Sequence, residues 1–289
     1  MITLLSSLLL STSMLIGDGS KAKQAEDVSV SMLRAETRQA VEDDGLLLVG
    51  EDIEYKVSYS FFNLGKIRLQ VLDRWERDGR TIYKALCSID SNPSIPFVDL
   101  HIRFISEFDE EIFSYSWISA DSSKEKIFYR KFTFDHDSLR AVVEQGTKPH
   151  KSTYVVERID TFRVTDKCQD GLSLFYFARR YVRQSQQLNI PTFIDTAQVN
   201  TFINFMNRVE PVEIDAVDYP VETVYFEGEA NFVGVFGLTG GFKGWFSNDD
   251  ARMPIVARMN VILGSVKVEL MKWHRPLWEP PRYRGGATR

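Results

Sequence analysis

From about residue 50 onward, apolar and polar residues alternate along the chain with a period of two. In DIEYKVSYSFF, which begins at Asp52, the apolar positions are Ile53, Tyr55, Val57, Tyr59 and Phe61. This period is typical of a strand with one buried face. The residues NLG then predict a turn, and KIRLQVLDRW and TIYKALCSI repeat the pattern on either side of the Asp78-Gly79 turn. Three strands joined in this way predict an antiparallel meander.

The same alternation continues to about residue 273, interrupted by polar clusters that are typical of turns. The further predicted strands are LHIRFISEF, IFSYSWIS, EKIFYRKFTFD, LRAVVEQ, AQVNTFINFMNRV, VETVYFEGEANF, GGFKGWFS, PIVARMNVIL and SVKVELMKW. The pattern therefore predicts a mainly β fold, built as a long curved antiparallel sheet or an incomplete β-barrel. We expect a single domain from residue 48 to residue 273.

One segment has helical periodicity instead. DGLSLFYFARRYVRQSQQ predicts an amphipathic helix over about 170–188, with Asp170 as its N-cap and NIP as its end. Its apolar side should pack on the concave side of the sheet through Leu172, Phe175, Tyr176 and Tyr181. Three arginines, Arg179, Arg180 and Arg183, should lie on the other side. They indicate a solvated helix face, with an anionic ligand or lipid headgroup as the alternative.

The two ends of the chain differ from this domain. Residues 1–22 contain an apolar run, Ile2–Ile16, followed by a small-x-small pattern at Ser20-Lys21-Ala22, and predict a secretory signal segment. No Lys or Arg precedes the apolar run, so a buried element is the alternative. Residues 23–47 predict a linker, and residues 274–289 predict a disordered tail. We therefore expect a periplasmic or otherwise exported protein, associated with a membrane peripherally at most.

Composition narrows the possible functions. The formal net charge of −5 provides no basic field for nucleic acid. The two cysteines, Cys87 and Cys168, leave open a disulfide or two buried free thiols. There is no CxxC, and the four histidines are scattered without ligand spacing, at His101, His136, His150 and His274. The sequence therefore predicts neither a metal site nor a cofactor.

The stretch WFSNDDARMP places two aspartates beside an arginine. Asp249 and Asp250 are adjacent, so in an extended chain their side chains point to opposite faces and cannot act together on one bond. In a turn, aspartates cap backbone N–H groups, and Arg252 can pair with them. The pattern favours a turn over a catalytic site, with Pro254 opening the next strand.

Other candidate sites are weaker. GVFGLTGGFKG does not have the spacing of a phosphate-binding loop, so its glycines indicate hairpins or close strand packing. The acidic run Asp109-Glu110-Glu111 indicates a solvated turn, and Ser173 lacks the surroundings of a nucleophile elbow. The sequence thus predicts no catalytic residue. The glycines of GVFGLTGGFKG are Gly234, Gly237, Gly240, Gly241 and Gly244.

Three segments resemble motifs of the DUF3108 family of bacterial envelope proteins. GEDIEYKVSYSFFNLGKIRLQV (50–71) resembles its opening strand and turn, and DGLSLFYFARR (170–180) resembles its Asp-x-Leu-Ser-x-x-Tyr-x-x-Arg helix. GWFSNDDARMPIVARMNVILGSVKVEL (244–270) is similar to its closing hairpin and Gly-Ser-Val strand. The resemblance implies the fold and an exported location, and it carries over no activity and no catalytic residues.

Three functions follow as hypotheses. The first is a non-enzymatic envelope protein whose curved sheet binds a hydrophobic or amphiphilic small molecule, or docks an envelope protein. The second is a glycan-acting hydrolase whose carboxylates, such as Glu107, Glu227 and Glu229, meet only in the folded chain. The third is a purely structural or assembly role. The aromatic-rich strands and the lone helix favour the first.

Overall fold

The computed structural model describes residues 45–95, 99–123, 126–148, 153–230, 232, 238–261 and 264–285. Within these ranges the chain forms one helix, α2 (Ser173–Tyr181), and fourteen strands. The strands are β1 (Asp52–Tyr59), β2 (Phe62–Arg77), β3 (Arg80–Ser91), β4 (His101–Asp109), β5 (Ser114–Asp121), β6 (Ile127–Asp135), β7 (Arg140–Lys148), β8 (Val155–Arg163), β9 (Ser185–Ile194), β10 (Ala197–Val212), β11 (Val221–Ala230), β12 (Leu238–Ser247), β13 (Pro254–Val261) and β14 (Ser265–His274). The predicted signal segment lies outside the described residues.

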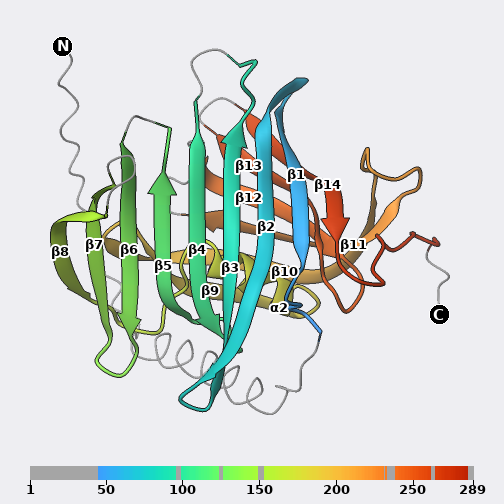
Figure 1. Cartoon of the computed structure of the whole chain (residues 1–289). Coiled ribbons are helices and arrows are strands. Elements are labelled where there is room, and N and C mark those ends of the chain that lie inside the picture. Colours follow the sequence, from blue (N-terminus) through green and yellow to red (C-terminus); the bar gives the residue numbers. More distant parts are fainter. Residues whose placement is uncertain are drawn as a thin grey trace, which may run out of the picture. The chain divides into compact units, whose positions relative to one another are not determined.

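All fourteen strands belong to one antiparallel sheet, which confirms the predicted fold class. Their order is β8-β7-β6-β5-β4-β3-β2-β1-β14-β13-β12-β11-β10-β9, so the sheet is open, with β8 and β9 at its ends (Figure 1). Consecutive strands are neighbours in the sheet, as the short turns predict, except β8 and β9, which α2 separates in the chain. In addition, β1 pairs with β14, so that Tyr55 faces Leu270. The first and last strands of the domain therefore meet in the middle of the sheet.

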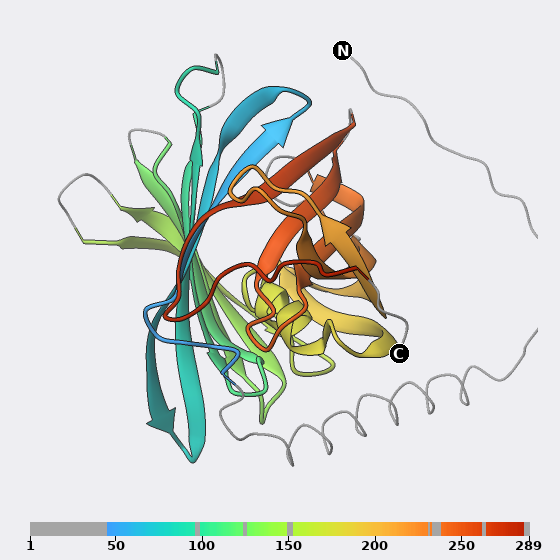
Figure 2. The same ribbon diagram turned by 90° about the vertical axis from the view of Figure 1, so that its right-hand side faces the viewer.

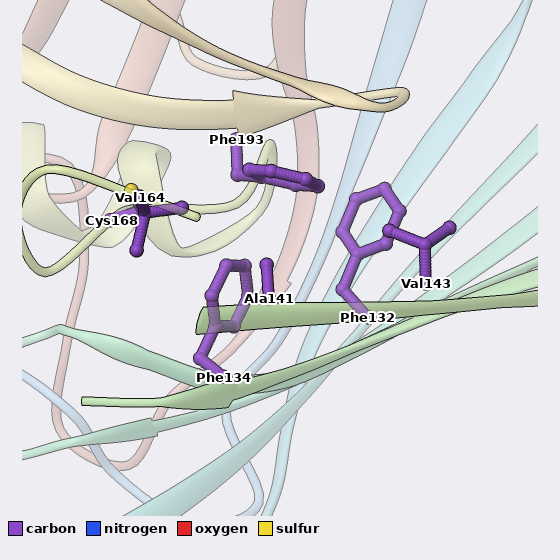
Figure 3. Packing of buried hydrophobic residues seen from close by; sticks show 7 residues of the cluster. All are labelled: Phe132, Phe134, Ala141, Val143, Val164, Cys168 and Phe193. Carbon is purple, nitrogen blue, oxygen red and sulfur yellow. The ribbon is translucent and has the colours of Figure 1, made fainter. Parts of the chain in front are cut away.

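The sheet bends, and its two ends pack against each other through aromatic side chains. Phe193 of β9 is fully buried, and its ring lies 5.1 Å from that of Phe132 and 5.7 Å from that of Phe134, both on β6 (Figure 3). Ala141 and Val143 of β7 complete this cluster together with Val164 and Cys168. The alternating apolar residues of the concave face are therefore core residues.

Helix α2 lies inside the bend (Figure 2). The ring of Tyr176 lies 5.2 Å from that of Phe108 on β4, and the ring of Phe175 lies 6.0 Å from that of Phe246 on β12. Leu172, Tyr176 and Tyr181 are buried as predicted, whereas Phe175 is half-buried. The helix thus joins the two halves of the sheet.

The helix is shorter than predicted, and its C-terminal part is a strand. It ends at Tyr181, and Ser185–Ile194 forms β9, in which Leu188 and Ile190 are buried at alternate positions. The residues NIP lie within this strand and do not terminate the helix. Pro191 is tolerated there because β9 is an edge strand. The predicted helix pattern failed here because QSQQ carries no apolar residue that distinguishes a period of 3.6 from a period of two.

The first turn also differs from its prediction. The chain reverses at Ser60 and Phe61, where Ser60 has a φ of 53° and the Phe61 side chain is 83% exposed. The residues NLG belong to β2 instead. Gly65 is required there by close packing, since a Cβ atom would lie 2.3 Å from the carbonyl oxygen of Asp90.

The segment after β14 is not a disordered tail as far as residue 285. Trp278 is buried, and the main-chain N–H of Tyr283 donates to the carbonyl oxygen of Pro220 at 2.8 Å. Leu46 is also buried, so the domain begins before residue 48. Prolines and glycines suggested disorder for the tail, but its tryptophan supplies apolar area that the domain buries.

Candidate functional site

The helix motif builds a buried charge network. The Arg179 side chain is fully buried, and its Nη1 lies 2.6 Å from Oε1 of Glu51, the residue before β1. Its Nη2 donates to the carbonyl oxygens of Leu46 at 3.0 Å and Ala251 at 2.9 Å. One guanidinium therefore ties together the start of the domain, the helix and the turn that precedes β13.

Two neighbours complete this network. Arg275, just after β14, forms a second ion pair with Glu51. The ring of Tyr176 lies 5.6 Å from the Arg179 guanidinium. Burial opposes a charge at this place, but the Glu51 carboxylate keeps the pKa of Arg179 above its usual value. The charges of this network are paired within the protein, although Nε of Arg179 has no hydrogen-bond partner among the described residues. Buried charges paired in this way are typical of a structural element.

The position of Arg179 corrects the prediction that Arg179, Arg180 and Arg183 share a solvated helix face. Arg179 was expected on the solvated side of the helix, yet it points into the domain, because Glu51 lies beside the last turn of α2. Arg183 remains at the surface, where it pairs with the exposed Asp250 at 3.0 Å. The three arginines therefore do not form one anion-binding surface.

Asp170 organises the beginning of the helix. Its Oδ1 accepts the N–H groups of Leu172 at 2.7 Å and Ser173 at 2.9 Å, and its Oδ2 accepts the hydroxyls of Ser106 and Ser114. The helix itself begins at Ser173, so Asp170 caps the turn that leads into it. Burial raises the pKa of Asp170, and the four donors oppose that shift.

Ser173 is fully buried and is engaged with the same aspartate. Its hydroxyl accepts the main-chain N–H of Asp170 at 2.8 Å. This reciprocal arrangement holds the turn that leads into α2.

The closing turn has the geometry of a capped turn. Oδ1 of Asp249 accepts the N–H of Arg252 at 3.0 Å and the hydroxyl of Ser247 at 2.7 Å, and its Oδ2 accepts Nε1–H of Trp278 at 2.8 Å. Nη1 of Arg252 donates to the carbonyl oxygen of Arg180 at 2.8 Å. Asp249 thus holds the turn, β13 and the segment after β14 together.

The acidic run after β4 is more buried than predicted. Asp109 is fully buried, accepts the N–H groups of Glu111 and Phe113, and lies 3.0 Å from Nη1 of Arg80. Burial raises its pKa to about 6, and the N–H donors and Arg80 oppose that rise. The run forms a turn as predicted, but the carboxylate of Asp109 points into the protein interior instead of into solvent.

The glycines of β12 allow close packing on one face of the sheet and leave space on the other face. A Cβ atom on Gly244 would lie 2.2 Å from the Phe226 ring, so that ring occupies the place of a side chain. Gly241 lies between Glu229 and the strand that carries Asn260. Gly234 and Gly237 lie outside the described residues. These positions fit the hairpin and packing interpretation of the glycine-rich segment.

A groove of about 440 Å³ lies on β10–β14, in the region of Gly241. We call it the β10–β14 groove. Most of its side chains belong to the face opposite the core, because the residues at the alternate positions, such as Phe226 and Val268, are buried. The lining residues are Phe202, Glu227, Gly228, Glu229, Gly241, Phe242, Lys243, Arg258, Asn260 and Ser265.

Cations face each other across this surface. Lys243 lies directly opposite Arg258 on β13 and Glu227 on β11, and Arg258 lies directly opposite Lys267. Lys267 pairs with Glu269. Lys243 and Arg258 form no ion pair with any residue that the structure describes. Like charges directly opposite each other destabilise a sheet, so this row is a place where an anion would be stabilising.

The carboxylates of the hydrolase hypothesis do not meet at one place. Glu227 and Glu229 both line the groove, and Oε2 of Glu227 accepts the Tyr225 hydroxyl at 2.6 Å. Glu107 lies on β4, where it contacts Lys84 at 3.1 Å and is not part of this lining.

Cysteines and histidines add no metal centre among the described residues, where no cluster of three His, Cys, Asp or Glu side chains could hold an ion. Cys87 and Cys168 are free and buried, and burial raises the pKa of each thiol to about 12. His101 lies 2.8 Å from Asp90 at the surface, and His150 lies outside the described residues. The two cysteines are therefore core side chains, which settles the alternative that the sequence left open.

The motifs that form this domain define its family. The family model described as "Protein of unknown function (DUF3108)" matches residues 54–271, most of the chain. The chain belongs to the DUF3108 family. The match begins within β1, ends within β14 and includes α2 and the groove. Arg179 of the buried network lies inside the matched region, whereas its partners Glu51 and Arg275 lie just outside it.

Solved structures and curated proteins provide less information about this chain than its family does. One solved structure, the β-barrel-like protein of the domain of unknown function DUF1849 from Brucella abortus, is 9% identical, with a TM-score of 0.49. The match covers 79% of this chain and 98% of that protein. Comparison with curated proteins finds no match. No helix within the described ranges has the length and apolar character needed to cross a lipid bilayer.

Proposed function

We propose that this DUF3108 protein is a non-enzymatic binding protein of the bacterial envelope that holds the anionic head of an amphiphile in the β10–β14 groove. The observation that carries the proposal is the row of cations, Lys243 opposite Arg258, which lack an ion pair within the described part of the chain. A bound phosphate or carboxylate would accept charge-assisted hydrogen bonds from both.

The size and lining of the groove support a small ligand. Its volume of about 440 Å³ falls within the range that ligand sites occupy. Asn260 and Ser265 add neutral polar groups to the cations, and Phe202 and Phe242 add apolar surface. The concave face is a poorer candidate, because its rings, such as Phe132 and Phe205, are buried against other side chains.

The binding proposal is tested with an anionic lysophospholipid, inorganic phosphate and an uncharged monoacylglycerol, titrated calorimetrically. We expect the lysophospholipid to bind most tightly, phosphate more weakly, and the acylglycerol least. Lys243→Ala combined with Arg258→Ala should weaken the lysophospholipid by at least about tenfold, the effect of one lost charge-assisted bond. Lys272→Ala, an exposed cation outside the groove lining, is the control. Unchanged affinity in the double variant would refute the proposal.

A second function, glycan hydrolysis, is favoured by Glu227 and Glu229, two carboxylates on the same face of one strand. The two functions predict opposite effects of Glu227→Gln and Glu229→Gln. If the groove binds an anion, loss of a nearby negative charge raises the affinity for the lysophospholipid. If the groove hydrolyses a glycan, either substitution abolishes turnover, because the acid or the base is missing.

The envelope location rests on the apolar segment Ile2–Ile16 and the small-x-small pattern at Ser20-Lys21-Ala22. We expect the mature chain to begin near residue 23. N-terminal sequencing of the protein from its native host measures this directly. A cytoplasmic protein with an intact Met1 would remove the export part of the proposal and leave the binding part standing.

A further inference from the structure

The two ends of the sheet are protected differently. At one end, the residues before α2 cover the edge of β9: the N–H of Gln169 donates to the carbonyl oxygen of Pro191, and the N–H of Phe193 donates to that of Gln169, both at 2.8 Å. At the other end, β8 is exposed along most of its length. The exposed fractions are 51% for Val155, 48% for Val156 and 59% for Ile159. An exposed apolar edge strand is a template for another strand.

The hydrogen-bond pattern shows which residues of β8 are available. The N–H of Val164 donates to the carbonyl oxygen of Leu139 at 3.0 Å, and this pair continues the register in which Arg163 faces Arg140. Hydrogen-bonded pairs alternate along an antiparallel ladder. Asp160 therefore bonds to β7 through its main chain, whereas the N–H and C=O of Ile159 and Thr161 point toward the open edge.

We propose that β8 pairs antiparallel with β8 of a second copy of this chain, about a two-fold axis at Ile159. This surface is separate from the β10–β14 groove, and the inference goes beyond the proposed function. In this register Ile159 bonds to Ile159 of the second copy through both main-chain groups. Arg158 then faces Asp160 of the second copy, and Asp160 faces its Arg158, so each interface contains two opposite-charge pairs.

The charges select this register. Within one chain Arg158 and Asp160 already contact each other, with Nη2 and Oδ1 at 3.1 Å, so pairing exchanges partners without leaving a charge uncompensated. Moving the axis to Thr161 would place Asp160 opposite Phe162 and Ile159 opposite Arg163. An axis nearer Val156 would fall in the irregular part of β8, where the register with β7 shifts between Arg158 and Val156. A homodimer joined at β8 follows, because a two-fold contact uses both open edges and closes the assembly.

A cysteine placed on the axis tests this geometry. In a hydrogen-bonded antiparallel pair the Cα atoms lie about 5.5 Å apart, within the range that a disulfide spans. Ile159→Cys should therefore form a disulfide-linked dimer almost completely under mild oxidation. Thr161→Cys is the matched control on the same edge, since two such residues would lie about 13 Å apart. The native thiols are buried and do not compete. Equal crosslinking of both variants, or of neither, would overturn the proposal.

Charge reversal tests the register without any crosslink. The wild-type chain should be a dimer by light scattering after size exclusion. Arg158→Asp and Asp160→Arg should each weaken the dimer by at least about tenfold, the effect of one lost charge pair. The combined variant restores opposite charges and should dimerise like the wild type. A monomeric wild type, or single variants that dimerise as well as the wild type, would contradict the proposal.

A fold control accompanies these variants. Thermal melting shows whether each one is folded. If a charge variant is not, Ile159→Pro replaces it, because this substitution removes only an N–H that points to the open edge and leaves the bonds to β7 intact. Folded Ile159→Pro protein is expected to be a monomer, and a dimer would overturn the proposal.

Discussion

Two groups of charged residues in this domain have opposite surroundings. Around α2, Glu51 and Arg179 are fully buried and Arg275 is half-buried, and both arginines pair with Glu51. On the β10–β14 groove, Lys243 and Arg258 are exposed and face each other without an ion pair in the described ranges. The helix motif supplies only Arg179 of the first group, and no motif marks the second. The difference teaches that a charge within a motif can serve the fold, while the charges of the proposed binding site carry no motif.

The largest expected effect is on the buried group. Arg179→Met should lower the free energy of unfolding by about 3–5 kcal/mol, because Glu51 loses one of its two cations in a dry site. Chemical denaturation measures this loss, and lysophospholipid affinity should not change. Arg183→Met is the control, since Arg183 and its partner Asp250 are exposed, and it should cause no measurable loss. A loss below about 1 kcal/mol for Arg179→Met would show that the network does not hold the fold.

The sequence predicted the sheet better than the positions of these charges. Strict alternation located strands such as β1 and β3, because one face of each is buried. It located the strands that carry Lys243 and Arg258, but it did not show that these two cations lie opposite each other, because that depends on the register between β12 and β13. The helix spacing placed Arg179 at a solvated position, because periodicity cannot show that Glu51, distant in sequence, lies beside the last turn. Long-range pairing of this kind becomes visible only in the folded chain.

His136 is a half-buried polar side chain with one ring nitrogen that is unpaired within the described part of the chain. Nε2 of His136 has no hydrogen-bond partner among the described residues, and burial, aided by the charge of Lys167, lowers the pKa of this histidine to about 4. The unfolded value is about 6.5. The histidine is therefore neutral in the folded state, and its contribution to stability is present above pH 6.5 and lost as the pH falls toward 4.

We expect His136→Phe to remove this dependence, since the ring lies between Tyr115 and Phe134 and phenylalanine has a similar shape. The difference in unfolding free energy between wild type and variant should change by at most about 1.4 kcal/mol per pH unit over this range, less where water reaches the ring. The stability of the wild type alone is not sufficient, because Asp109 also titrates in this range. Its pKa is raised to about 6, so its contribution to stability is lost as the pH rises through 6. Subtracting the variant's free energy of unfolding from that of the wild type removes this contribution. Parallel curves for the two proteins would contradict the prediction.

The two aspartates of the closing turn should contribute differently to stability. Asp249→Asn should lower the free energy of unfolding by about 1 kcal/mol, because its carboxylate accepts from Arg252, Ser247 and Trp278. Asp250→Asn, at an exposed position, should change nothing measurable. Lysophospholipid binding should be the same in both variants. Loss of binding with an unchanged melting temperature would mean that the turn is a functional site after all.

The smallest expected effect has the opposite sign. Arg258→Gln should raise the free energy of unfolding slightly, by roughly 0.2–0.5 kcal/mol at low salt, because it removes a cation that lies directly opposite Lys243 on β12 and Lys267 on β14. The gain should shrink as salt rises and screens the repulsion. The same variant should bind the anionic lysophospholipid more weakly, so stability and affinity would change in opposite directions. Arg183→Gln is the matched control, since it removes an exposed cation that has a carboxylate partner and should bring no gain. A loss of stability in Arg258→Gln would show that this arginine already has a compensating anion within the protein, and the reason to expect a ligand there would disappear.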